Sequence, residues 1–524
     1  MSSWIILLTI GVYAGSLLLI SWIAGRRNAD NEAFFTGNRT SPWYMIAIGM
    51  VGASLSGVSF VSVPGLAGRI DMTYLQMVVG FFFGYVVIAK VLLPLYYRLN
   101  LISIYSYLGE RIGWYGYKTG ASFFLLSKLI GAASRLYLVV WILQRYVFDQ
   151  WGIPFVWTTI VCVLVVWLYT FRSGIRTIIR TDVLQTVCLI TMLIAILWIV
   201  KNKLGMDTAT MIQTISQSPH FRMFEWKDWS STQHFVKQFF SGVFMTIVMT
   251  GLDQDMMQKN LSCRNLKDAR KNMYWYGLAF TPINFLFLCL GILLLIAAAQ
   301  LQIELPASGD EILPLFCTSG VLGQAVLIFF TIGIIAAAFS SADSALTALT
   351  TSFCIDILGL HPVETCGRTS PGRTSPDRTS PDRTSPGRTS PNTRTSPDRT
   401  PQDSPPHKTR IIVHLLISIL FIFIILIFKA INNRSLIDAI YTIASYTYGP
   451  LLGLFSFGLF TKRRTNDRFV PLICIVSPVI CYLTNHFVYL STGYLFGYEL
   501  LILNGLITFA GLWLCSILKL PLHN

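Results

Sequence analysis

Residues 49–65 read Gly-Met-Val-Gly-Ala-Ser-Leu-Ser-Gly-Val-Ser-Phe-Val-Ser-Val-Pro-Gly. This stretch is apolar enough to lie within a bilayer, yet it contains glycines, one proline and four serines. Because glycine and proline weaken or interrupt helices, we predict a helix that breaks in the middle of the membrane. Broken helices expose backbone N–H and C=O groups, which is tolerated at membrane depth only where these groups line a cavity and coordinate an ion or substrate. The stretch therefore predicts a transport site.

The composition of the whole chain is that of a polytopic membrane protein. Of its 524 residues, 53% are hydrophobic and 12% are charged, and the mean hydropathy is +0.59. At roughly 20 residues per span plus loops, a bundle of about a dozen spans uses nearly the whole chain. The formal net charge of +15 does not indicate nucleic-acid binding, because the basic residues fall in short loops between apolar segments. We therefore expect a small-molecule solute and membrane lipid as partners, with no nucleic acid and no obligate protein partner.

Hydropathy predicts an all-α membrane protein with about thirteen transmembrane helices. They lie near residues 4–24, 43–66, 74–97, 119–146, 153–171, 181–201, 236–252, 273–299, 322–358, 410–430, 438–460, 468–489 and 497–518. Basic residues gather in alternate loops, one of which contains Lys259, Arg264, Lys267, Arg270 and Lys271. By the positive-inside rule these loops are cytoplasmic. With an odd number of spans, we predict a multi-pass protein of the plasma membrane with its N-terminus outside and its C-terminus in the cytoplasm.

A second glycine-interrupted span covers residues 239–252, Phe-Phe-Ser-Gly-Val-Phe-Met-Thr-Ile-Val-Met-Thr-Gly-Leu. It comes five helices after the first, and because five is odd, the two broken helices start from opposite faces of the membrane. Two inverted repeats of five helices produce this arrangement, with substrate and ion bound near the midplane at the interface of the repeats.

A low-complexity segment divides the chain. Arg-Thr-Ser-Pro recurs every five or six residues over 368–397. Because such a sequence cannot bury apolar surface, we predict that residues 360–409 form a disordered cytoplasmic linker. Residues 1–359 then contain the first helix, the first repeat and the start of the second, and residues 410–524 contain the remainder of the second repeat and two C-terminal helices. A tolerated repeat expansion is favoured here over a regulatory or partner-binding role.

Charged residues in three of the predicted helices are candidates for a functional role. In the ninth, Asp343 lies among the hydroxyls of Ser340, Ser341 and Ser344, an oxygen-rich environment suited to an alkali cation. Asp182 begins the sixth, where it either serves such a site or only complements the helix dipole.

The fourth helix contains Lys128 and, seven residues later on the same face, Arg135. Arg135 either pairs permanently with a resident acid or receives a substrate carboxylate through its bidentate fork.

Other chemistries lack support in the sequence. The ten cysteines lie mostly within apolar spans and form no C-x-x-C pair, so neither a disulfide framework nor a zinc site is indicated. The sequence also has no metal-ligand cluster, Gly-x-Ser-x-Gly motif or phosphate-binding loop. We therefore do not expect an enzyme.

Several phrases together resemble the sodium:solute symporter family, which includes symporters for sialic acid, proline and galactose. The resemblance covers nearly the whole chain apart from the repeat linker. The phrases are Phe-Phe-Thr-Gly-Asn-Arg at 34–39 with Pro42-Trp43, the stretch 56–64, Thr-Asp-Val-Leu-Gln at 181–185, Asp-Gln-Asp-Met-Met-Gln at 253–258 with Lys-Asp-Ala at 267–269, Ser340-Ser341, and Tyr-Gly-Pro-Leu-Leu-Gly at 448–453.

The resemblance implies the LeuT-type fold, with two inverted five-helix repeats, one preceding helix and two following helices. It implies Na⁺ as the coupling ion, in a site made by the carbonyls of Gly52, Leu55 and Ala337 and the hydroxyls of Ser340 and Ser341. Some members hold a second sodium at positions that match Asp182, Ser341, Asp343 and Ser344. This chain departs from the usual pattern by an aspartate, not serine or threonine, at 343, so a second sodium, a proton and a purely structural acid are all compatible with that position.

The resemblance also places substrate contacts at Ser56 and Ser59. Arg135 matches the arginine that receives the substrate carboxylate in sialic acid symporters. The expected function is sodium-coupled import of a small polar organic solute, with an acidic sugar such as sialic acid as one candidate. A neutral sugar, an amino acid and a monocarboxylate are the alternatives, and a symporter-like membrane sensor is less favoured.

Overall fold

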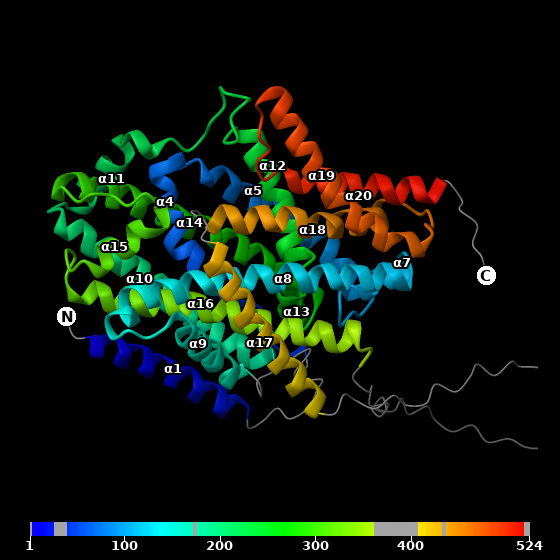
Figure 1. Cartoon of the computed structure of the whole chain (residues 1–524), viewed down its shortest axis with the longest axis horizontal. Helices are drawn as coiled ribbons and strands as arrows, with labels where there is room; N and C mark the ends of the chain where they lie inside the picture. Colours follow the sequence, from blue (N-terminus) through cyan, green and yellow to red (C-terminus); the bar gives the residue numbers. More distant parts are fainter. Residues whose placement is uncertain (1–2, 26–38, 171–174, 361–406, 432–435, 518–524) are drawn as a thin grey trace, which may run out of the picture.

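The computed structural model describes residues 3–25, 39–170, 175–360, 407–431 and 436–517. The regular secondary structure within these ranges is helical, and the helices form one bundle (Figure 1). The Arg-Thr-Ser-Pro repeat lies outside the described residues, as does nearly all of the predicted linker 360–409. The division of the chain at that linker therefore stays a prediction.

The long helices fall into two groups of five, preceded by α1 (Ser3–Gly25) and followed by α19 (Val470–Thr492) and α20 (Leu500–Ile517). The first group is α3 (Trp43–Ser54) with α4 (Gly57–Ile70), α5 (Tyr74–Val87) with α6 (Leu93–Arg98), α8 (Trp114–Leu143), α9 (Phe155–Thr170) and α10 (Ile175–Lys203). The second is α12 (Phe235–Thr246) with α13 (Gln254–Leu261), α14 (Leu266–Leu301), α16 (Gln324–Ser352), α17 (His407–Ile431) and α18 (Leu436–Phe460). Three shorter helices connect them: α7 (Ser106–Arg111), α11 (Thr208–Gln217) and α15 (Ile312–Thr318).

Each of the thirteen predicted segments coincides with a helix or a bent pair of helices. Within the described ranges, nine helices are long and apolar enough to cross a membrane, and up to eleven spans result if each of two bent pairs counts as one. Two shorter apolar helices, Leu7–Ile23 and Phe155–Thr170, account for the remaining predicted segments. The number of segments that cross the bilayer stays a prediction.

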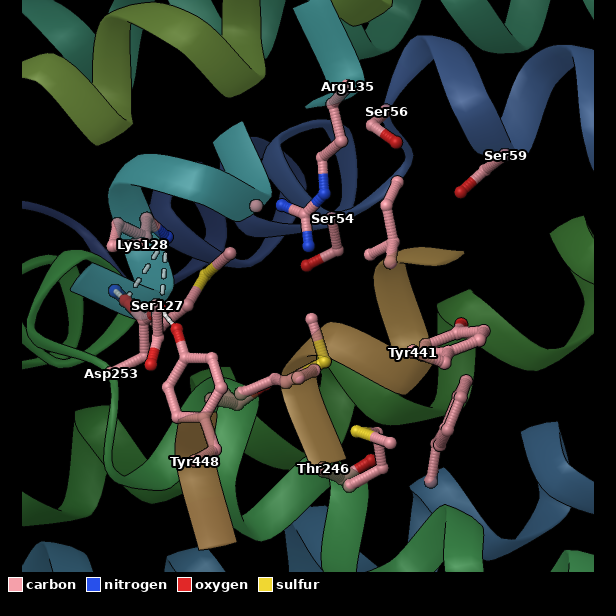
Figure 2. Close-up of a pocket in the computed structure, with 18 of the residues that line it drawn as sticks. Ser54, Ser56, Ser59, Ser127, Lys128, Arg135, Thr246, Asp253, Tyr441 and Tyr448 are labelled. Atoms are coloured by element: carbon pink, nitrogen blue, oxygen red, sulfur yellow. Dashed lines mark hydrogen bonds and ion pairs between the residues drawn. The ribbon is translucent and has the colours of Figure 1, made fainter. Parts of the chain in front are cut away.

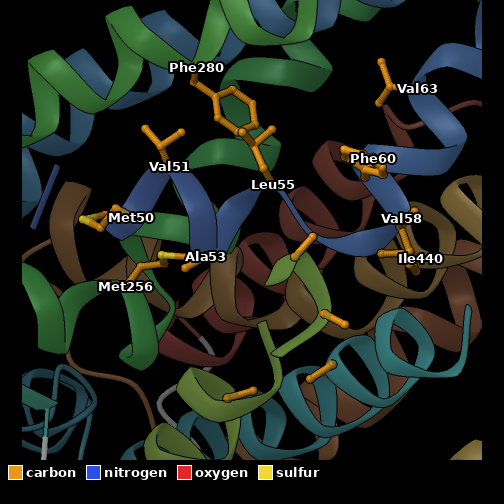
Figure 3. Close-up of a cluster of buried hydrophobic side chains, with 14 of the residues drawn as sticks. Met50, Val51, Ala53, Leu55, Val58, Phe60, Val63, Met256, Phe280 and Ile440 are labelled. Atoms are coloured by element: carbon orange, nitrogen blue, oxygen red, sulfur yellow. The ribbon is translucent and has the colours of Figure 1, made fainter. Parts of the chain in front are cut away.

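The first predicted break lies between α3 and α4, which bend by 61° around residues 55 and 56. The Ser56 N–H donates to the Ser54 carbonyl at 3.0 Å instead of continuing the helical pattern. The helix restarts at Gly57 as α4, and Pro64 lies inside α4 without ending it. The apolar side chains around the break, including Val51, Leu55 and Phe60, are buried in the core (Figure 3). This packing stabilises the bend between α3 and α4.

The second break lies between α12 and α13, which bend by 65°. α12 ends in a π-helical turn over Ile247–Gly251, and the helix restarts at Gln254. The interruption therefore comes at residues 252 and 253, at the end of the predicted glycine-interrupted span. Asp253 caps the new helix, because its side chain accepts hydrogen bonds from the N–H groups of Asp255 and Met256 at 2.9 and 3.4 Å.

Glycines allow α5 and α12 to pack closely. A Cβ atom added to Gly80 would lie 2.2 Å from the Phe239 carbonyl oxygen, and one added to Gly242 would lie 2.2 Å from the Met77 carbonyl oxygen. Small residues at such crossings let helix backbones approach each other in membrane proteins. The contact holds the second helix of the first group against the broken helix of the second group, next to the cavity described below.

Candidate substrate and ion sites

A cavity lies where the two broken helices face each other (Figure 2). Its empty space, which includes open solvent at the mouth, is about 960 Å³. Ser56 and Ser59 from the first broken helix and Arg135 from α8 all line it. The structure therefore brings the three predicted substrate contacts together.

The cavity also has an aromatic and hydroxyl lining that the sequence analysis did not identify. Tyr85, Tyr276, Tyr441 and Tyr448 line it. The Tyr85 hydroxyl donates to the Tyr276 hydroxyl at 2.9 Å, and the Tyr276 and Ser54 hydroxyls are hydrogen-bonded to each other. Aromatic rings with hydroxyl groups offer an apolar surface and hydrogen bonds to a solute at the same time.

Arg135 points into the cavity with its guanidinium group near the first break (Figure 2). The side chain is half-buried. Its guanidinium makes no ion pair with any carboxylate of the described residues. Arg135 was predicted either to pair with a resident acid or to receive a substrate carboxylate. The described residues provide no acid for the first of these roles.

Lys128 also faces the cavity, but it is neutralised. Its ammonium group lies 3.1 Å from Asp253 Oδ2 and 2.7 Å from Asp255 Oδ2, and all three side chains are at most 6% exposed. The Tyr448 hydroxyl donates to Asp253 at 3.0 Å. The two cations of α8 thus differ: Lys128 is held by acids of the second broken helix, whereas Arg135 presents its charge to the cavity.

The predicted sodium ligands lie where α16 packs against the end of α3. Ala337, Ser340 and Ser341 are buried on one face of α16, at the i, i+3 and i+4 spacing of a helix. The Ser341 hydroxyl donates to the Ala53 carbonyl at 3.3 Å, which brings α16 against the first break.

The first break leaves backbone carbonyl groups outside the regular helical hydrogen-bond pattern. The Gly52 carbonyl would accept the Ser56 N–H in an unbroken helix, but that N–H is bonded to Ser54. The Leu55 carbonyl belongs to the residue between the two helices. Hydroxyls that donate one hydrogen bond keep oxygen lone pairs for a cation. Carbonyl and hydroxyl oxygens are hard ligands of the kind that sodium prefers, and the assignment of these residues to sodium stays a prediction.

Comparison with known proteins decides the family. A model described as the sodium:solute symporter family matches residues 34–359. The chain belongs to this family. The symporter is 25% identical over 353 residues to the sodium/sialic acid symporter of Proteus mirabilis, and the match covers 66% of this chain and 69% of that protein. It is 24% identical to the sodium/sialic acid symporter of Aliivibrio fischeri, over 66% of this chain and 68% of that protein.

Solved structures support the fold. The symporter superimposes on a Na⁺-coupled sialic acid symporter with a TM-score of 0.76, at 20% identity, over 99% of this chain and 98% of that one. It superimposes on Mhp1, a transporter of the nucleobase-cation-symport-1 family, with a TM-score of 0.50 at 12% identity, over 92% and 93% of the two chains. The predicted LeuT-type fold is confirmed. The symporter is thus an integral, multi-pass secondary transporter that uses Na⁺ as its coupling ion and moves a small-molecule solute, and it is not an enzyme.

The four residues predicted to bind a second cation do not all face the same point in the symporter. Asp182 and Ser344 both contact the ammonium group of Lys259, at 2.8 Å from Asp182 Oδ2 and 2.7 Å from the Ser344 hydroxyl. Asp343 faces α9 instead, where the Tyr169 hydroxyl donates to it at 3.0 Å. Ser341 faces the first break.

Two expectations from the sequence require correction. Asp182 does not begin its helix, because α10 starts at Ile175 and places Asp182 about two turns inside, with its side chain fully buried. It is therefore not a helix-terminal anion. Lys259 is not a loop cation, because it lies inside α13 with 1% of its side chain exposed. The i, i+4 spacing of Asp255 and Lys259 is the signal in the sequence from which an ion pair along a helix could have been predicted, but not its burial or its contact with Asp182.

Proposed function

We propose that the protein imports an anionic, carboxylate-bearing organic solute, with an acidic sugar such as sialic acid as the first candidate. The observation that carries this proposal is the guanidinium of Arg135, which faces the cavity without a carboxylate partner among the described residues. A charged side chain at membrane depth is costly unless something compensates it. A bound carboxylate supplies that compensation and fits the two parallel N–H donors of arginine.

The other charged residues that line the cavity are paired with each other, so Arg135 is the one proposed to bind the carboxylate of the solute. Lys128 and Asp253 neutralise each other across 3.1 Å. Arg135 is therefore the charged side chain of the described cavity lining that forms no ion pair with a described carboxylate. The names of the two bacterial relatives, both sodium/sialic acid symporters, support the same substrate class.

Uptake into proteoliposomes tests the proposal. We expect an inward sodium gradient, but not an equal potassium gradient, to drive accumulation of radiolabelled sialic acid. Unlabelled neutral sugars, amino acids and monocarboxylates are added in turn as competitors. Stronger competition by a neutral sugar than by any acid would overturn the anion assignment, and binding without accumulation would favour the membrane sensor.

The sodium site makes its own prediction. Ser340→Ala and Ser341→Ala should each raise the sodium concentration for half-maximal uptake by about 3- to 10-fold, because each removes one oxygen ligand that water replaces only in part. Initial uptake rates over a sodium series in each variant measure this. Ser308→Ala, outside the site, is the matched control and should show the wild-type sodium requirement. Unchanged sodium dependence in both variants would contradict the assignment of these hydroxyls.

We propose further that the symporter lies in the plasma membrane with its N-terminus outside and its C-terminus in the cytoplasm. The basic residues Arg264, Lys267, Arg270 and Lys271, just before and within the first turns of α14, support this orientation, and Glu304 belongs to an opposite, less basic loop. An antibody against an added C-terminal tag should bind only after cells are permeabilised. Binding to intact cells would reverse the orientation.

A further inference from the structure

We infer that the ammonium group of Lys259 takes the position of a second coupling cation, so that the protein binds a single sodium ion. This inference rests on the sodium site that we propose at Ser340 and Ser341. It concerns the neighbouring acid, Asp182, whose carboxylate is fully buried. The observation behind it is that a cation of the chain itself already contacts that acid.

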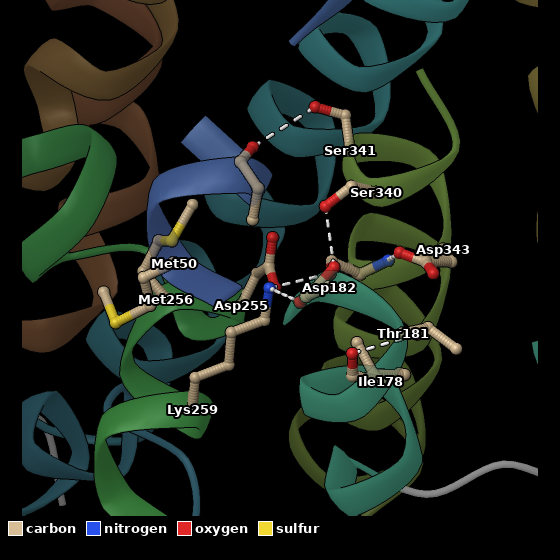
Figure 4. A network of polar contacts seen from close by, with 12 residues as sticks. Met50, Ile178, Thr181, Asp182, Asp255, Met256, Lys259, Ser340, Ser341 and Asp343 are labelled. Atoms are coloured by element: carbon tan, nitrogen blue, oxygen red, sulfur yellow. Dashed lines mark hydrogen bonds and ion pairs between the residues drawn. The ribbon is translucent and has the colours of Figure 1, made fainter. Parts of the chain in front are cut away.

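The contacts of Lys259 are those of a bound monovalent cation. Its nitrogen lies 2.8 Å from Asp182 Oδ2, 2.7 Å from the Ser344 hydroxyl and 3.7 Å from Asp255 Oδ1 (Figure 4). The lysine side chain is 1% exposed, so these protein oxygens take the place of water around the ammonium group. A carboxylate and a hydroxyl are also the ligands that the predicted second sodium would use.

Repulsion by the ammonium group weakens the binding of a sodium ion to the same ligands. A sodium bound to Asp182 and Ser344 would lie about 4 Å from the ammonium nitrogen. At an effective dielectric constant of about 20, the repulsion at that separation corresponds to roughly a thousand-fold loss of sodium affinity. The site therefore holds either the lysine or a second sodium.

The remaining contacts of Asp182 connect it to the first sodium site. Its Oδ1 atom accepts a hydrogen bond from Ser340 at 2.7 Å, so the acid orients a hydroxyl that we assign to the coupling ion. The tethered ammonium group balances the charge of Asp182 at the same time.

Equilibrium binding of radiolabelled sodium to the purified protein tests the inference without knowledge of the substrate. Choline chloride keeps the ionic strength constant. We expect one sodium per wild-type protein. Lys259→Met removes the ammonium group and should give two, with the second site binding about a thousand-fold more tightly than in the wild type. Lys259→Arg keeps the charge and should stay at one.

The double variant Lys259→Met with Asp182→Asn removes both charges and is the matched control, which should return to one sodium. Two sodium ions in the wild type, or one in a folded Lys259→Met protein, would overturn the inference. The wild-type count decides even where Lys259→Met does not fold. A wild type that binds no sodium would instead overturn the proposed sodium site, so that the two failures are distinguishable.

Discussion

Replacing Arg135 by lysine is expected to weaken the binding of an acidic solute about 10- to 100-fold while the thermal stability stays near that of the wild type. Lysine keeps the positive charge but loses the planar pair of donors that matches a carboxylate. A hydrogen bond to a charged group contributes about 1.5–3 kcal/mol, which corresponds to this range. Stability should be preserved because Arg135 holds no carboxylate of the described residues.

Substrate binding and thermal unfolding of Arg135→Lys and Arg135→Ala, measured side by side with sialic acid as the probe, check this result. Arg135→Ala should bind more weakly still. Arg145→Lys makes the same chemical change near the end of the same long helix, outside the cavity, and should bind like the wild type. A collapse of stability in both Arg135 variants would show that the arginine has a structural role instead.

Lys128→Met, in contrast, is expected to destabilise the fold. Its free energy of unfolding should be lower by about 3–5 kcal/mol whether or not solute is present. The change removes the ammonium group that lies 3.1 and 2.7 Å from Asp253 and Asp255. Two carboxylates would then be left buried near each other without their shared partner, and removing one partner of a buried ion pair costs energy of this size.

Thermal denaturation of the purified protein, with and without sialic acid, measures the effect. Lys203→Met, at the exposed C-terminal end of α10, is the matched control and should unfold like the wild type. A Lys128→Met protein as stable as the control would mean that the pair with Asp253 and Asp255 contributes little to folding.

Local chemistry explains what could be predicted from the sequence. The first break could be predicted from the serines and glycines around residue 55. Without these residues, such an apolar span would be expected to continue as a regular helix. The position of the break within the stretch was not predictable in the same way. Pro64 is the stronger helix breaker by propensity, yet it lies within α4 and tertiary packing tolerates it there.

The sequence could not predict which charged residues form ion pairs with each other. Lys128 and Arg135 occur on the same face of one helix, and no local property tells which of them meets an acid from a helix more than a hundred residues away. Lys259 resembled a loop cation because several basic residues follow it closely. Only the bend before α13 turns its side chain back toward Asp182.

The buried ion pairs restrict how the two halves of the molecule move during a transport cycle. Lys128 and Lys259 connect α13 to α8 and α10, and separating either pair would cost several kcal/mol in each cycle. We therefore expect α13 to travel with α8 and α10 as one rigid body. We then expect the hinges at residues 55–56 and 252–253, where the two broken helices bend. Spin-label distances from α8 should stay constant to α13 and change to α12 when sodium and solute are added, and a changing distance to α13 would place the hinge elsewhere.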